Sequence, residues 1–131
     1  KDINSSYRSI FKTMQHLWDV ESIWWQRLKH AEPVEVPGNT FSGSIIEQTN
    51  HLLEQSKVWK EWIAIATETV LETPLDYKNL GGKQFTQPVA EIILHLFSHQ
   101  HYHRGQIVTM LRQVGITTIP STGFIEFARK K

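Results

Sequence analysis

The feature that most constrains this chain is a proline-free, largely apolar run over residues 89–111, which carries four of the seven histidines. Its apolar residues recur with a helical period, and so long a helix predicts an all-α fold built around it. At about 100° per residue, His95, His99 and His103 lie on one stripe of this helix, whereas His101 points elsewhere. A functional site is therefore expected along that stripe.

The spacing of His99 and His103 is that of helix-borne metal sites, since two histidines four residues apart can reach one ion through their imidazole nitrogens. Gln106 extends the same line. The competing interpretation is a set of surface histidines, or of histidines satisfied by protein partners, because histidine is of intermediate burial and often structural. Spacing alone leaves both interpretations open.

Composition excludes several classes of protein. A chain of 131 residues is expected to form a single domain over residues 1–131, and a net charge of +1 gives no electrostatic case for nucleic acid. No apolar run is long enough for a membrane span and no signal peptide is visible, so a cytoplasmic protein is expected. Because the chain has no cysteine, a metal must be held by histidine with aspartate, glutamate or water.

A first amphipathic helix is predicted over residues 7–29, with Ser5 or Ser6 as its N-cap. Its apolar residues cover a broad arc. Glu21 lies inside this arc, where a carboxylate is costly without a partner. Asp19 lies off the arc and is expected in solvent.

The connection over residues 31–44 contains two prolines and two glycines, so it cannot be helical throughout. A second helix is predicted over residues 44–71. Its apolar positions are Ile45, Leu52, Trp59, Trp62, Ile63 and Ala66. Residues 76–86 predict a small β-hairpin around a Gly-Gly turn.

The long third helix has recognisable ends. Pro88 suits its first turn, and Gly115 suits the position just after its last residue. Gly105 lies in its interior, which indicates either close approach of a helix or ligand, or a simply tolerated glycine. In the tail, residues 124–127 are apolar and predict a terminal helical turn that docks on the rest of the chain.

Three long helices with five tryptophans need a further packing partner to cover their apolar surface. Either a helix that precedes the first residue or a second subunit would be this partner, and homodimerisation is compatible with both. The chain does not begin with methionine, which agrees with an N-terminal piece being absent.

A metal site normally has at least three protein ligands, so His99 and His103 need a partner from another helix. The candidates are His16, His51, His30, Glu21 and His95. His95, one turn along the same helix, suits a pocket wall better than a ligand. His30 lies at a helix end, where a protonated imidazole is favourable without any metal.

The other candidates also differ in their expected place. His16 is mid-helix at the edge of the apolar arc and could meet the third helix across the bundle. His51 is expected to be polar and partly exposed, outside the site. Glu21 suits a hydrogen-bond acceptor in the core or behind the ligands. The residues alone favour His16 without deciding the set.

Two segments resemble the DinB family of metalloenzymes. The pattern His-x-x-x-His-Arg-Gly-Gln at residues 99–106, with the helix that continues to Gly115, is similar to the family's signature helix. Residues 14–28 are similar to its other histidine-bearing helix, and the hairpin before the signature helix fits as well. The resemblance covers essentially the whole chain.

The resemblance implies a four-helix bundle in which His16, His99 and His103 hold a divalent metal, often within a homodimer. Family members ordinarily begin with a further helix, which this chain lacks. Arg104 and Gln106 match the motif; Arg104 lies opposite the histidine stripe and is expected to be structural, in an ion pair or an interface.

The resemblance also implies a function, a thiol S-transferase that activates a small thiol such as bacillithiol, mycothiol or glutathione. Zinc or nickel is expected first, with iron, cobalt and manganese as other ions that such a site accepts. One alternative is a metal-dependent hydrolase with Glu21 or His95 as general base. Others are a non-catalytic, stress-associated metal-binding or interaction protein, and a bundle without metal.

Overall fold

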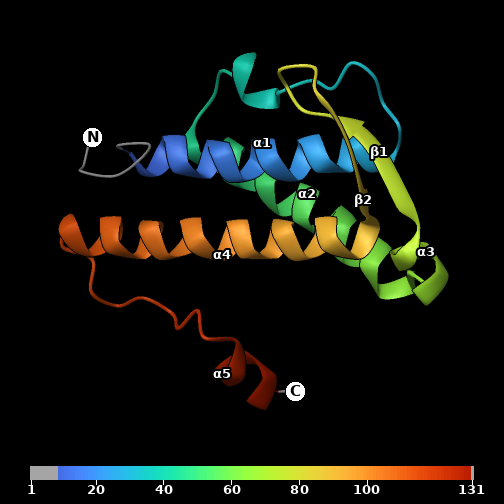
Figure 1. The fold of residues 1–131 in the computed structure, drawn as a ribbon. Coiled ribbons are helices and arrows are strands. Elements are labelled where there is room, and N and C mark those ends of the chain that lie inside the picture. Colours follow the sequence, from blue (N-terminus) through green and yellow to red (C-terminus); the bar gives the residue numbers. More distant parts are fainter. Residues whose placement is uncertain (1–8, 131) are drawn as a thin grey trace.

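The computed structural model describes residues 9–130, and most of them are helical (Figure 1). The elements in chain order are α1 (Ile10–Leu28), the 3-10 turn η1 (Pro37–Asn39), α2 (Ile45–Ile65), α3 (Glu68–Glu72), β1 (Pro74–Lys78), β2 (Gln84–Pro88), α4 (Val89–Gln113) and α5 (Phe124–Arg129). The all-α fold with one small hairpin is thereby confirmed. None of these helices combines the length and the apolar character that crossing a membrane requires, within the described residues.

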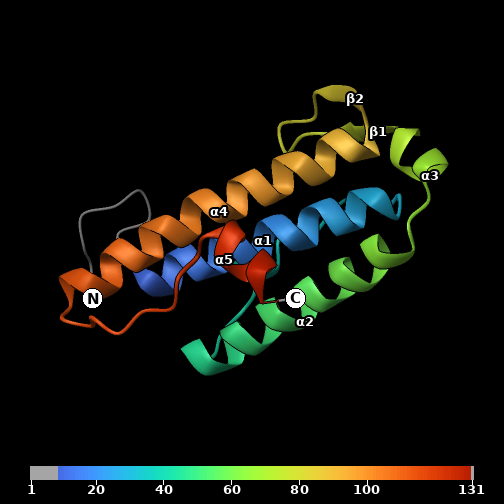
Figure 2. The same cartoon turned by 90° about the horizontal axis from the view of Figure 1, so that it is seen from below.

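The three long helices form the body of the fold, and α1 lies between the other two (Figure 2). It packs against both α2 and α4 along their lengths. The hairpin folds over the end of the bundle where α1 ends and α4 begins (Figure 1). The terminal helical turn predicted at residues 124–127 is part of α5, but α5 stands away from the bundle instead of docking on it.

Helix α1 begins at Ile10, later than predicted, because Ser9 has an extended backbone and its hydroxyl accepts the N–H of Lys12. The predicted caps, Ser5 and Ser6, lie outside the described residues. The placement of Asp19 in solvent was wrong: it is half-buried, and its Oδ1 accepts the N–H of Gly38 at 2.7 Å. The loop after α1 folds back onto this helix, which the periodicity of α1 alone does not show.

The predicted second helix is two helices. Helix α2 begins with a capping box of Ser44 and Glu47, as its sequence favours. It ends at Ile65 because Ala66 is extended, and Thr67 then caps α3 by accepting the N–H of Val70. The continuous helix over residues 44–71 was therefore wrong in its last turns. Ile45, predicted as an apolar inner position, is exposed.

The hairpin pairs antiparallel, with Tyr77 opposite Phe85, and its strands reach two residues further than predicted at either end. Pro88 is the last residue of β2 and the cap of α4, one residue before the helix rather than within its first turn. Gly115 follows α4 with φ of +94°, which confirms its place. A side chain at Gly105 would meet no described atom within 4 Å, so this glycine is a tolerated one.

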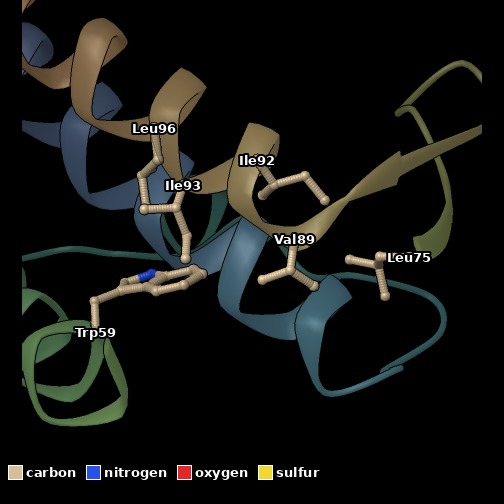
Figure 3. Packing of buried hydrophobic residues seen from close by; sticks show 6 residues of the cluster. All are labelled: Trp59, Leu75, Val89, Ile92, Ile93 and Leu96. Atoms are coloured by element: carbon tan, nitrogen blue, oxygen red, sulfur yellow. The ribbon is translucent and has the colours of Figure 1, made fainter. Parts of the chain in front are cut away.

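The apolar core lies at the hairpin end of the bundle (Figure 3). It consists of Trp59, Leu75, Val89, Ile92, Ile93 and Leu96. Trp59 reaches from α2 towards α4, and its Nε1 donates to the backbone oxygen of Glu21 in α1 at 2.9 Å. One side chain thus connects three helices.

Candidate metal centre

Three imidazoles from two helices meet beyond the apolar core. His16 comes from α1, and His99 and His103 come from α4. Their possible ligand nitrogens all lie within 4.8 Å of one another. The ring centroids are 4.8 Å apart for His16 and His99, 4.7 Å for His16 and His103, and 4.5 Å for His99 and His103. This group could hold a divalent metal ion.

The register of α1 against α4 brings His16 to the histidine stripe. Gln100 sets it, because its Nε2 donates to the backbone oxygen of Leu17 at 3.1 Å, one residue beyond His16. Leu17 and Gln100 are both buried. A slip of one helix against the other would leave the buried amide of Gln100 without its acceptors on α1, so this bond favours one register.

Hydrogen bonds to glutamine fix the tautomers of the two α4 histidines. The Nδ1 of His99 is 2.9 Å from Oε1 of Gln100, and the Nδ1 of His103 is 2.6 Å from Oε1 of Gln106. An amide oxygen only accepts, so each Nδ1 carries the proton and donates it. The orientation of the Gln100 amide follows from its own two donations through Nε2, to Leu17 and to Glu21. The His99 ring therefore keeps its lone pair on Nε2, and the His103 ring does the same when the Gln106 oxygen faces it.

The geometry fits a bound ion. The Nε2 atoms of His16 and His99 are 2.9 Å apart. Two imidazole nitrogens bound tetrahedrally to one ion at about 2.0–2.1 Å lie about 3.3 Å from each other, so these two nitrogens, in hydrogen-bond contact here, need to separate only slightly to admit an ion. Imidazole donors suit zinc, nickel, copper, iron and cobalt, so the residues present match a divalent transition metal without selecting one.

The environment of His16 and His99 favours the neutral imidazole, which is the form that binds a metal. Burial, together with the neighbouring His99 and His103, lowers the pKa of His16 to about 4. Burial also lowers the pKa of His99, and nearby His103 and His95 act in the same direction, although the bond to Gln100 opposes them. His16 and His99 are therefore unprotonated at neutral pH.

Behind the imidazoles lies a buried polar network centred on Glu21. Its Oε2 accepts from Gln100 at 2.7 Å, and its Oε1 accepts from the hydroxyl of Ser56 in α2 at 2.6 Å. Burial raises the pKa of the Glu21 carboxyl, while Ser56, Gln100 and the charge of Arg104 lower it. Glu21 thus has the core acceptor role that its place on the apolar arc predicted, and it supports His99 through Gln100.

Gln100 and Ser56 were missed by the sequence reasoning. The signal for Gln100 was its place on the same helical side as Ile93 and Leu96, where a polar residue needs a partner. Gln106, expected only to extend the stripe and to match the family motif, lies with its Oε1 2.6 Å from Nδ1 of His103, and its Nε2 donates to the hydroxyl of Tyr102 at 3.3 Å.

Comparison with known proteins bears on the whole arrangement. The sequence model of the DinB family matches residues 1–129. This chain belongs to the DinB family. It is also similar to Protein DinB of Bacillus subtilis (strain 168), with 37% identity over 51 residues that make up 39% of this chain and 30% of that protein. No solved structure matches the chain.

The other histidines of this DinB-family chain lie outside the cluster. His95 is exposed and flanks the cluster, with its ring 6.0 Å from His99 and 5.9 Å from Trp24. His51 stacks on Trp18 at 4.8 Å, away from the cluster. His101 is exposed.

The two remaining candidates also lie apart from the centre. His30 follows the end of α1 with φ of +60° and is exposed. Arg104 is exposed, and the ion pair expected for it does not form with any of the described residues. Its charge nevertheless acts on the carboxyl of Glu21, so it belongs to the electrostatic surroundings of the site.

Proposed function

We propose that this DinB-family protein is a metal-dependent thiol S-transferase in which His16, His99 and His103 hold one divalent ion, zinc or nickel in the first place. The observation that carries the proposal is that the ligand group consists of His16, His99 and His103 alone: no other histidine, aspartate or glutamate of the described residues joins it. A structural zinc site has four protein ligands, whereas a catalytic one has three and leaves a position for a small molecule.

The absence of cysteine favours a small thiol as the source of sulfur. An ion in such a centre supplies Lewis-acid chemistry, because it lowers the pKa of a thiol or of water and polarises a carbonyl. The protein's own contribution is orientation: Gln100 and Gln106 hold the rings, and Glu21 anchors Gln100. The candidate thiols are bacillithiol, mycothiol and glutathione.

A hydrolytic function finds less support. The general base considered for it, Glu21, is buried and already accepts hydrogen bonds on both carboxylate oxygens. His95 is the base that remains for that alternative, since it is exposed beside His99. Thiol transfer is preferred because it needs no further base at this position.

We also propose a cytoplasmic, single-domain protein that acts on a small molecule and pairs as a homodimer. Exposed apolar side chains on α4 support the pairing, among them Leu94 at 66% and Phe97 at 55% exposure. The near-neutral net charge supports the exclusion of nucleic acid as a partner.

Elemental analysis of the purified protein tests the site. Near-stoichiometric metal is expected in the parent and in His101→Ala, whose histidine is exposed on the same helix, and is expected to be lost in His99→Ala. A thiol-transfer assay with each candidate thiol and an alkyl halide should then follow the metal content. Metal without turnover would make the protein a non-catalytic metal binder, and no metal after loading with zinc or nickel would leave an interaction module.

A further inference from the structure

A pocket of about 370 Å³ lies at the far end of α1 from the histidines. Its walls are the last turn of α1, the loop that follows this helix, and the turn of the hairpin. Arg27, which lines it, is eleven residues after His16 on the same helix, or about 16 Å along the helix axis. The pocket is thus separate from the proposed metal centre.

Arg27 is a half-buried cation without an anion. Its guanidinium carbon lies 4.4 Å from the ring centroid of Trp24 and 5.2 Å from that of Tyr77, so two aromatic rings hold it in place. It has no hydrogen bond or ion pair to any of the described residues, and its Nε is buried without a partner. Burial lowers the pKa of Arg27, but a guanidinium stays charged in proteins. A charge in this position is stabilised by a counter-ion.

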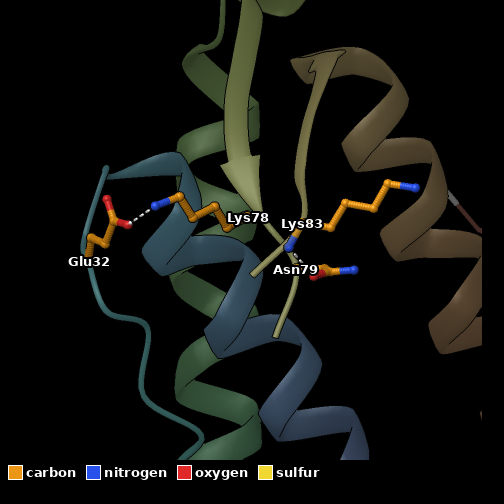
Figure 4. Close-up of polar contacts among 4 residues, drawn as sticks. All are labelled: Glu32, Lys78, Asn79 and Lys83. Carbon is orange, nitrogen blue, oxygen red and sulfur yellow. Dashed lines mark hydrogen bonds and ion pairs between the residues drawn. The ribbon is translucent and has the colours of Figure 1, made fainter. Parts of the chain in front are cut away.

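Neither of the acidic residues that line the pocket, Glu32 and Asp76, forms an ion pair with Arg27. Glu32 pairs with Lys78 at 3.2 Å, and this pair links the loop after α1 to the end of β1 (Figure 4). Asp76 accepts the hydroxyl hydrogen of Thr86 across the hairpin. The turn itself is held by Asn79, whose Oδ1 accepts the N–H of Lys83 at 2.9 Å (Figure 4). Lys78 thus has Glu32 as its counter-charge, whereas Arg27 forms no ion pair with any of the described residues.

The walls on either side of Arg27 are partly apolar. Pro33 and Val34 contribute from the loop after α1, and Tyr77 and Leu80 contribute from the hairpin. The volume is at the small end of the range of ligand pockets. A planar guanidinium matches a planar carboxylate through two parallel hydrogen bonds. A phosphate dianion would call for a second uncommitted cation.

We propose that this pocket binds a small carboxylate with a short apolar or aromatic body. The carboxylate pairs with the guanidinium of Arg27, and the body lies against Val34 and Leu80. The bound carboxylate would thus be the counter-ion that Arg27 does not have among the described residues.

Benzoate is the probe for this site, with benzamide as its neutral counterpart and inorganic phosphate as an anion of different shape. Benzoate is expected to bind the full chain with a millimolar dissociation constant by calorimetry and to shift the Nε–H resonance of Arg27 in NMR spectra. Arg27→Met should weaken binding roughly ten- to a hundredfold. Arg112→Met, which changes an exposed arginine at the end of α4, should leave it unchanged. His99→Ala should also leave it unchanged, because the two sites are separate.

Three results would overturn the proposal. One is benzoate binding that Arg27→Met leaves intact, and another is benzamide or phosphate binding as tightly as benzoate. The third is an Arg27 Nε–H resonance that saturating benzoate does not move. This last measurement uses the unaltered chain, so it decides the question even if Arg27→Met does not fold.

Discussion

The two ends of the helical bundle are packed from different kinds of side chain. At the hairpin end, Trp59, Ile92 and Leu96 are each at most 3% exposed and meet in an apolar cluster. Towards the other end, the buried positions of α4 hold Gln100, His103 and Met110, so an amide and an imidazole stand beside the apolar side chain there. Apolar burial stabilises a fold wherever it occurs, whereas buried polar groups only offset their desolvation when every partner is in place. The apolar end therefore carries the stability, and the polar end carries the geometry of the site.

The largest expected effect is at the apolar end. Trp59→Ala should lower the free energy of unfolding by about 3–5 kcal/mol, because it removes a buried aromatic ring and leaves a cavity. The bond from its Nε1 to Glu21 is lost as well. Urea denaturation followed by circular dichroism measures the change. Val58→Ala, one residue away and 38% exposed, should cost under about 0.5 kcal/mol, and equal losses in both variants would contradict this division of the bundle.

The next effect belongs to the polar end and needs a metal. Zinc at about a hundred to a thousand times its dissociation constant should stabilise the metal-free protein by about 3–4 kcal/mol, because only the folded chain assembles the three histidines. Thermal unfolding with and without zinc measures it. His103→Ala should show no such gain while His101→Ala keeps it, and a gain that survives in His103→Ala would place the ion elsewhere.

Gln100 tests whether the network behind the histidines matters. Gln100→Leu removes the acceptor of His99 and a donor to Glu21, so metal affinity should fall roughly ten- to a hundredfold. Competition with a chelating dye measures it. Gln113→Leu, an exposed glutamine on the same helix, serves as the control. If both variants bind metal like the parent, the rings are held by packing alone.

The smallest effect is on pH dependence. His16 has a pKa of about 4 in the folded protein and about 6.5 when unfolded, so the unfolded chain binds more protons between these values. Metal-free stability should therefore fall as the pH drops from about 6.5 to about 4, by of order 1–2 kcal/mol after allowance for solvent screening. Urea midpoints measured in chelator across this range should drop less in His16→Gln, and an identical pH slope in both proteins would refute the assignment to His16.

The sequence predicted those features that depend on one helix at a time. The stripe of His99 and His103 follows from helical period alone, and Gly115 marks the end of α4 because only a residue that tolerates positive φ fits there. The convergence of His16 on that stripe came from the family resemblance, since the edge of the apolar arc only favoured it. Its physical basis is the register between α1 and α4.

Most of the features that were missed depend on contacts between segments that are distant in the sequence. Asp19 was placed in solvent because nothing in α1 shows that the loop with Gly38 folds back over it. The predicted second helix was extended too far because Thr67 can either continue a helix or cap a new one with its hydroxyl, and the apolar pattern does not distinguish the two. Arg27 was overlooked because the aromatic ring of Tyr77 that covers it comes from a hairpin some fifty residues later.

The bond from Gln100 to the carbonyl of Leu17 has a consequence for how the protein matures. The same amide group sets the docking of α4 on α1 and the orientation of His99. A chain whose helices have docked out of step would thus also present a misaligned imidazole. An ion held by the three histidines would bind correctly docked molecules more tightly than misdocked ones, so metal affinity would report how well the two helices are assembled.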